Sequence, residues 1–173
     1  MIFVPPLLVA LAGRKAAFRD IMLRLMVTYL GCYLVYLVFP VIGPAELMPH
    51  YSGPLTDGTF YRLTHAAREA GDSLGTAFPS SHAAGAVTSA FLAWRWFRPP
   101  AGWLITVQAV GVLLATVYTQ NHFAVDTLAG LLLALTLQTL AVPALLRACE
   151  RERLIPVLPV RAPVLEPTTG GGL

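Results

Sequence analysis

The chain contains 173 residues, of which 56% are hydrophobic and only 12% are charged, and its mean hydropathy is +0.66. A soluble domain usually carries about a quarter charged residues. The composition therefore argues against an ordinary soluble domain and indicates that much of the surface faces lipid. The length favours one structural unit, and two cysteines are too few for a disulfide framework.

Four apolar stretches predict helices that cross a membrane, which requires about 20 mostly apolar residues, with a range of roughly 17–25. In chain order they are Ile21–Ile42, Ala83–Phe97, Ala101–Tyr118 and Phe123–Leu146. The second stretch reaches the required length only if the preceding Pro79–His82 lies in the head-group region. Met1–Ala12 is apolar but too short to cross alone. The pattern predicts an all-α polytopic membrane bundle of about four full spans plus a partial N-terminal one.

The basic residues orient these spans. If the chain crosses the membrane at each span, ten of the twelve fall on the same side, which the positive-inside rule places in the cytoplasm. They are Arg14, Lys15, Arg19, Arg24, Arg95, Arg98, Arg147, Arg151, Arg153 and Arg161. Arg24, just inside its span, is expected to extend toward the head groups. The net charge of +3 therefore reflects topology and predicts no nucleic-acid partner.

The spans divide the chain into a membrane-embedded domain, residues 1–146, and a basic, Pro/Gly-rich cytoplasmic tail, residues 147–173, that is expected to be disordered. Within the domain, residues 43–78 form an outer loop that contains several Pro and Gly breakers. The stretch Thr59–Ala70 mixes apolar and charged residues and predicts a short helix at the membrane surface.

All four histidines fall on the outer side of this topology. His82 and His122 each precede an inward-running apolar helix, so both imidazoles can face a common cavity at one membrane depth. His50 and His65 lack such a context and are interpreted as ordinary loop residues.

His122 and Asp126 are four residues apart, which in a helix places them on one face, about 6 Å apart along the axis. The carboxylate could then accept one imidazole N–H and leave the other nitrogen as a nucleophile or base. Alternatives remain open: Asp126 can be a solvated interfacial residue, each histidine can be satisfied at a helix end, and the pair together with His82 can bind a metal.

The segment Pro79-Ser80-Ser81 offers hydroxyl groups and unpaired backbone N–H groups at the start of a helix, where anions such as phosphate bind. His82 follows directly and could donate a proton to a departing oxygen. Ser80, Ser81 and His82 are therefore candidate site residues.

These residues resemble the motifs of the type 2 phosphatidic acid phosphatase superfamily, P-S-G-H and S-R-x5-H-x3-D. Pro79-Ser80-Ser81-His82 matches the first motif with Ser81 at the glycine position, and His122 and Asp126 match the second. The surrounding FPSSHAA and NHFAVDTLAG are most similar to the inositol phosphorylceramide synthase-like branch. The resemblance covers approximately residues 77–131.

The resemblance implies that His122 attacks phosphorus to form a phosphohistidine, that Asp126 orients His122, and that His82 protonates the leaving alcohol. Water or a second alcohol then accepts the phosphoryl group, and no metal or cofactor is required. The family fold has six membrane helices. Aligned by motif, Ile21–Ile42 corresponds to the third and Met1–Ala12 to the inner part of the second.

The sequence departs from the family pattern at its basic residues. The motif Ser-Arg falls on Ala115-Thr116, no K-x6-R-P block is present, and Ala45 stands where related proteins often carry a basic residue. Since phosphoryl transfer needs stabilisation of negative charge, Arg62 and Arg68 in the outer loop are the candidate substitutes.

We expect an integral-membrane lipid phosphate phosphatase or phosphotransferase of a bacterial plasma membrane, with an extracytoplasmic active site. Its expected partners are a lipid phosphate, the bilayer, and water or an alcohol as acceptor. Two alternatives are a catalytically impaired protein of the same fold that binds or moves phospholipid, and a metal-dependent intramembrane hydrolase.

Overall fold

The computed structural model describes residues 6, 9, 11–49, 51–71 and 73–151, without the side chains of residues 55, 60 and 67–71. The expectation of a helical fold is confirmed over these ranges, where helices are joined by short connections and one isolated β-bridge links Val41 to Thr76. The expected disordered tail lies outside the described residues from 152 onward, as does most of Met1–Ala12.

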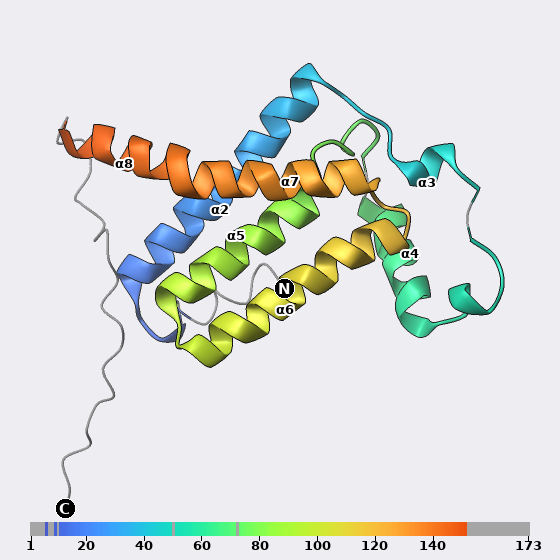
Figure 1. Cartoon of the computed structure of the whole chain (residues 1–173), viewed down its shortest axis with the longest axis horizontal. Helices are drawn as coiled ribbons and strands as arrows, with labels where there is room; N and C mark the ends of the chain where they lie inside the picture. Colours follow the sequence, from blue (N-terminus) through green and yellow to red (C-terminus); the bar gives the residue numbers. More distant parts are fainter. Residues whose placement is uncertain (1–5, 7–8, 10, 50, 72, 152–173) are drawn as a thin grey trace, which may run out of the picture.

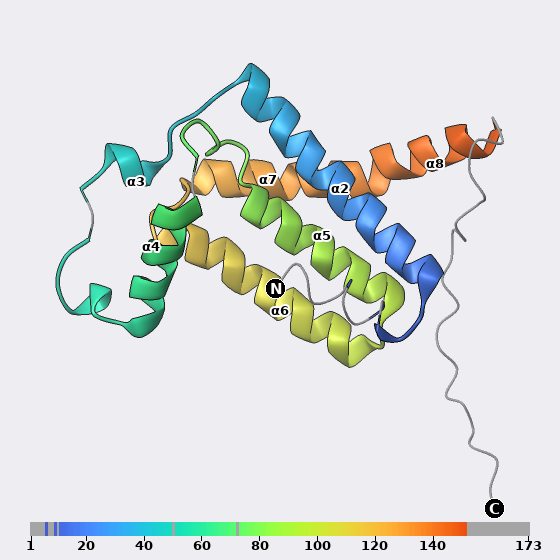
Figure 2. The same cartoon turned by 180° about the vertical axis from the view of Figure 1, so that it is seen from behind.

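Helix α5 occupies the centre of the bundle and contacts α2, α6 and α7 (Figures 1 and 2). The helices are α2 (Lys15–Val38), α3 (Pro44–Leu47), α4 (Thr59–Gly71), α5 (Ser81–Trp96), α6 (Pro99–Tyr118), α7 (Ala124–Thr136) and α8 (Val142–Arg151). A short 3-10 turn, η1 (Pro54–Thr56), precedes α4, and a π-helical turn, η2 (Leu137–Ala141), joins α7 to α8.

Three helical segments among the described residues are long and apolar enough to cross a membrane, which suggests a membrane protein. They are Lys15–Val38, Pro99–Tyr118 and Ala124–Arg151. The fourth full span is not confirmed, because α5 has 16 residues. At a rise of about 1.5 Å per residue its length is roughly 24 Å, less than the roughly 30 Å of a hydrocarbon core.

The helix ends differ from the expected ones for local reasons. Helix α2 ends at Val38, not Ile42, because Pro40 disfavours a helical conformation at the residue before it. Helix α5 begins at Ser81, before the expected Ala83, because the buried Ser80 is the N-cap and its Oγ accepts the Ala83 N–H at 3.3 Å. The last span continues through η2 to Arg151, beyond the expected end at residue 146.

Small residues allow the central helix to pack closely against its neighbours. Gly85, Ser89 and Ala93 of α5 are buried, whereas Gly111 of α6 is exposed. The closest approach is at Gly130 of α7, where an added Cβ would collide with the Ser80 carbonyl oxygen. This contact places the start of α5 directly against the first turns of α7.

A buried charged cluster joins the helices at the opposite end of α5. Asp20 is fully buried and accepts hydrogen bonds from Arg24 Nε at 2.9 Å, Arg95 Nε at 2.8 Å and Trp96 Nε1 at 2.7 Å. Arg24 is only 4% exposed and also donates to Gln138 Oε1 at 3.1 Å. The expectation that Arg24 extends toward the head groups is therefore wrong, because Asp20 and Gln138 provide partners inside the bundle.

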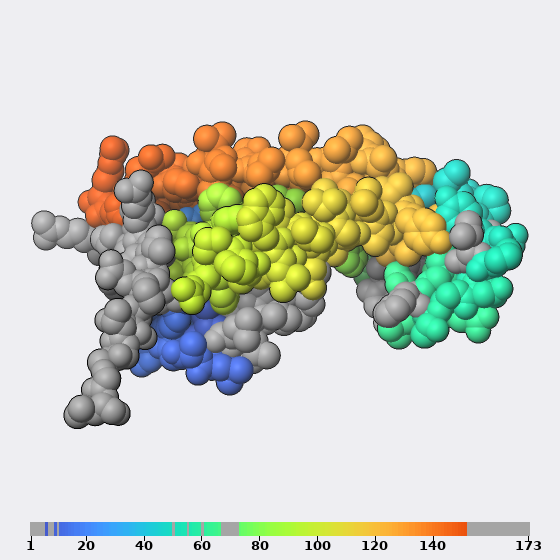
Figure 3. Space-filling model, turned by 60° about the horizontal axis from the view of Figure 1, so that its bottom comes forward, coloured from blue at the N-terminus to red at the C-terminus, as the bar shows by residue number. Residues whose placement is uncertain are grey.

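The segment between α2 and α5 gathers at the end of the bundle away from this cluster. Figure 3 shows the atoms of α3 and α4, in cyan and turquoise, beyond the end of α6. The connection from α2 to α3, the connection from α4 to α5 and the turn between α6 and α7 lie at the same end (Figure 1), and the Val41–Thr76 bridge joins the first two. The fold thus collects the outer loop and the starts of α5 and α7 in one region.

Candidate active site

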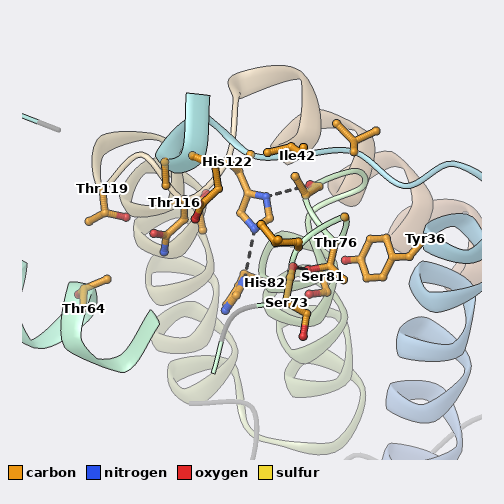
Figure 4. A pocket seen from close by; sticks show the side chains of 18 of the residues that line it. Tyr36, Ile42, Thr64, Ser73, Thr76, Ser81, His82, Thr116, Thr119 and His122 are labelled. Carbon is orange, nitrogen blue, oxygen red and sulfur yellow. Dashed lines mark hydrogen bonds between the residues drawn. The ribbon is translucent and has the colours of Figure 1, made fainter. Parts of the chain in front are cut away.

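A cavity of about 1080 Å³ lies in this region, between the end of α2, the start of α5 and the end of α6. Its wall also includes residues of the outer loop and of α4, and it contains both His82 and His122 (Figure 4). The described residues that line it include hydroxyl groups and apolar side chains but neither Lys nor Arg.

The two histidines that the sequence predicts to converge are in contact. His82 Nδ1 lies 3.4 Å from His122 Nε2, and the ring centroids are 5.6 Å apart. His82 is the second residue of α5 and is exposed, whereas His122 lies in the turn before α7 and is only 6% exposed. The site therefore pairs a buried imidazole with one that has room to turn.

The hydrogen bonds of His122 define its tautomer. Its Nδ1 lies 2.9 Å from the carbonyl oxygen of Ala77 (Figure 4). A carbonyl can only accept, so Nδ1 carries the proton and donates it, and Nε2 holds a lone pair that faces His82. Burial, together with the nearby His82, lowers the pKa of His122 to about 4, although the Ala77 carbonyl raises it in part. His122 is therefore neutral at pH 7.

Asp126 does not form the expected hydrogen bond with His122. Its Oδ2 accepts the backbone N–H of Phe123 at 2.9 Å, and its carbonyl oxygen accepts the N–H of Ser80 at 2.9 Å. The expected pairing assumed that His122 lies in the helix, but α7 begins at Ala124. As the third residue of α7, Asp126 instead reaches back to the N-cap residue and links α7 to the start of α5.

The two candidate serines occupy different environments. Ser80 is fully buried and its hydroxyl caps α5, whereas Ser81 lines the cavity next to His82. Of the two hydroxyl groups, the structure places that of Ser81 at the cavity wall. His65 lies outside the cavity wall and contacts the Tyr61 ring at 4.2 Å between centroids.

The candidate arginines are not brought to the described cavity wall. Arg62 forms an ion pair with Asp57 at 3.2 Å, with the two side chains 70% and 71% exposed. The side chain of Arg68 lies outside the described residues. Thr116, at the position of the family arginine, is buried and its Oγ1 lies 3.2 Å from Thr127 Oγ1.

The structure also shows groups that support the site and that no sequence motif indicates. The Ala77 carbonyl holds His122, and the Tyr36 hydroxyl donates to the Pro79 carbonyl at 2.8 Å. Backbone acceptors leave no pattern in a sequence, and Tyr36 lies in an apolar stretch where an aromatic residue is ordinary. Within the part of the chain that the structure describes, no group of three or more His, Cys, Asp and Glu is arranged to hold a metal ion.

Comparison of the sequence with known protein families identifies a superfamily. A family profile described as the PAP2 superfamily matches residues 1–140. No curated protein and no solved structure matched the chain. The profile does not assign the inositol phosphorylceramide synthase-like branch. Since the match covers most of the chain, the protein belongs to the PAP2 superfamily, whose members are generally phosphatases.

Proposed function

We propose that this protein is an integral-membrane phosphatase or phosphotransferase that acts on a lipid-linked phosphate ester through a phosphohistidine at His122. Superfamily membership suggests a phosphatase-type activity. The observation that carries the finer proposal is the lone pair of His122 Nε2, held toward the cavity by the Nδ1 hydrogen bond, with His82 directly beside it.

In the first step, His122 Nε2 forms a bond to phosphorus as the bond from phosphorus to the alcohol oxygen breaks. Protonated His82 donates a proton to that oxygen, so the alcohol leaves neutral. In the second step, water or an alcohol attacks the phosphohistidine while His82 takes its proton. Phosphate or a new ester is released and His122 recovers its lone pair.

The contact between the two rings must open during this reaction. In-line transfer places nucleophile and leaving oxygen on opposite sides of phosphorus, with roughly 3 Å from nucleophile to phosphorus and about 3 Å from acid to leaving oxygen. The ring nitrogens then lie roughly 6 Å apart or more, against 3.4 Å here. The exposed His82 is the ring that turns, because His122 is buried and bonded to Ala77.

The negative charge of the phosphoryl group needs stabilisation. Protonated His82 supplies one positive charge, and the site lies at the start of α5, the end of a helix where anions bind. Apolar residues of the cavity wall, among them Leu63, Leu74 and Val112, suit the lipid part of the substrate.

We place the site at the extracytoplasmic face of a bacterial plasma membrane, with the C-terminus in the cytoplasm. The support is the distribution of basic residues. Lys15 and Arg19 of α2, and Arg98 between α5 and α6, are exposed. The start of α2 and the connection from α5 to α6 lie at the end of the bundle away from the start of α5, which carries His82 (Figure 1). Water or an alcohol is the acceptor.

The second candidate is a catalytically impaired protein of the same fold that binds or moves phospholipid. One observation favours it: Thr116 occupies the position of the family arginine, and the described cavity wall carries no Lys or Arg.

The test is phosphate release from phosphatidic acid and a panel of other lipid phosphates by the purified protein in detergent with EDTA, beside His122→Ala. We expect turnover and an acid-labile phosphoenzyme in the parent, and loss of both in the variant while membrane insertion is retained. Added alcohols distinguish transfer from hydrolysis. Retained turnover in His122→Ala contradicts the mechanism, and lipid binding without turnover in the parent supports the second candidate.

A further inference from the structure

The tautomer of His122 depends on a backbone carbonyl, so the position of that carbonyl matters. Ala77 belongs to the connection before α5 and is held there by the segment that follows α2. Val41 N–H donates to Gly75 O at 3.2 Å, and Ala77 N–H donates to Val41 O at 3.1 Å. These two hydrogen bonds hold the backbone just before the Ala77 carbonyl, which faces His122 Nδ1.

The same segment also lies close to the turn that carries His122. A Cβ added at Gly43 would lie 3.1 Å from the carbonyl oxygen of Asn121 and 3.5 Å from the Ala77 Cβ. The φ of Gly43 is −82°, which any residue adopts, so a side chain here is opposed by the close neighbours and not by the backbone conformation. Ile42, between Val41 and Gly43, lies beside His122 at the cavity rim (Figure 4).

We propose that the segment Val41–Gly43 is the positioning element of the nucleophile, with Gly43 as its positioning residue. It holds the Ala77 carbonyl and the Asn121–His122 turn at the separation that keeps the His122 proton on Nδ1 and the lone pair on Nε2. The catalytic consequence rests on the function proposed above, whereas the effect on the tautomer does not.

The hydrogen bond between His122 Nδ1 and the Ala77 carbonyl is sensitive to small displacements. An imidazole protonates the nitrogen whose partner is best placed. If a methyl group at Gly43 pushes the two segments apart by a few tenths of an ångström, the bond from Nδ1 to Ala77 O weakens and the Nε2–H tautomer gains population. That tautomer has no lone pair on Nε2 and cannot attack phosphorus.

The test compares Gly43→Ala with Gly58→Ala in the purified, histidine-labelled protein. Gly58 is a matched control because it lies in the same loop and a Cβ there meets no atom within 4 Å. The readouts are the 15N shifts of the His122 ring, the thermal transition, and kcat and KM for phosphatidic acid. We expect Gly43→Ala to move the ring shifts toward the Nε2–H tautomer and to lower kcat by roughly tenfold or more, with KM and the thermal transition little changed. Gly58→Ala should match the parent.

Unchanged ring shifts and unchanged kcat in a folded Gly43→Ala protein overturn the proposal. Should that variant not fold, Val41→Pro removes the N–H donor to Gly75 without filling the space at Gly43, and it must move the same ring shifts. An inactive parent whose shifts respond to Gly43→Ala rejects the proposed function and keeps the positioning role. If the parent is active but the His122 ring shifts do not respond to Gly43→Ala, the proposed function stands and the positioning role is rejected.

Discussion

Burial and hydrogen bonding together set the tautomer and the pKa of His122. Its Nδ1–H is taken by a backbone carbonyl and its Nε2 faces a second imidazole, which is itself a site of positive charge when protonated. Both burial and His82 oppose a charge on His122 and so lower its pKa to about 4. A nucleophile with this pKa keeps its lone pair in acid, where an ordinary histidine would lose it.

This residue predicts a specific pH dependence. Because the pKa of His122 in the folded protein, about 4, lies below the ordinary histidine value of 6.5, the unfolded chain binds the proton more readily between these values. Stability therefore falls as pH decreases from about 6.5 to about 4. The 15N titration of His122 should have its midpoint near pH 4, and no loss of activity near pH 6.5 should arise from it. A midpoint near 6.5 contradicts the buried, neutral assignment.

At the scale of elements, the start of α7 connects the two histidine-bearing segments. The carboxylate of Asp126 accepts the Phe123 N–H in the first turn of α7. The backbone carbonyl oxygen of Asp126 accepts the N–H of Ser80 and so holds the start of α5. Gly130, one turn further along, lets the two helices approach at the Ser80 carbonyl. The separation between His82 and His122 is therefore set by the contact between the starts of α5 and α7.

Substitutions at Asp126 distinguish two roles for its carboxylate, which are capping helix α7 and orienting His122. Asn retains an oxygen that can accept the Phe123 N–H, so Asp126→Asn should keep turnover within about tenfold of the parent. Asp126→Ala loses the cap, which should cost about 1 kcal/mol of stability and lower turnover further. Steady-state kinetics and thermal unfolding in detergent check this. Equal and near-complete loss in both variants would instead show that the carboxylate itself serves His122.

At the scale of the whole molecule, polar groups concentrate at both ends of the central helix. One end carries the histidine pair, and the other carries Asp20 with Arg24 and Arg95, whose side chains are 0%, 4% and 19% exposed. Charges removed from water are tolerated only when they are paired, and here one carboxylate serves two guanidinium groups and an indole N–H. This cluster ties α2 to α5, and through Gln138 to η2, away from the chemistry.

Removal of the charge on Asp20 should therefore destabilise the bundle without altering the site. Asp20→Asn removes the carboxylate that pairs with the buried Arg24 and with Arg95, which should cost about 3–5 kcal/mol. Asp57→Asn is the control, because its partner Arg62 is exposed and such pairs contribute about 0–1 kcal/mol. Thermal unfolding in detergent measures both. Equal transitions for the two variants would mean that the Asp20 cluster contributes little.

Much of this protein could be predicted from the sequence, because the relevant signals are local. Long apolar stretches predicted three of the spanning helices, and the position of each histidine before an apolar helix predicted that His82 and His122 meet. The motifs around them indicated the superfamily to which the chain belongs. These conclusions depend on composition, length and short spacing, which do not require knowledge of how the helices pack.

Only the tertiary structure decided which groups serve these histidines. The acceptor for His122 is a backbone carbonyl 45 residues away, and no side-chain pattern encodes a carbonyl. The spacing of His122 and Asp126 suggested a pair, but the turn that ends at Phe123 keeps His122 out of the helix. Arg24 likewise turned inward because Asp20 and, 114 residues later, Gln138 offer it acceptors inside the bundle. Hydrogen-bond partners are set by the packing of distant segments, since a buried polar group must bond to whatever acceptor the fold brings within about 3 Å.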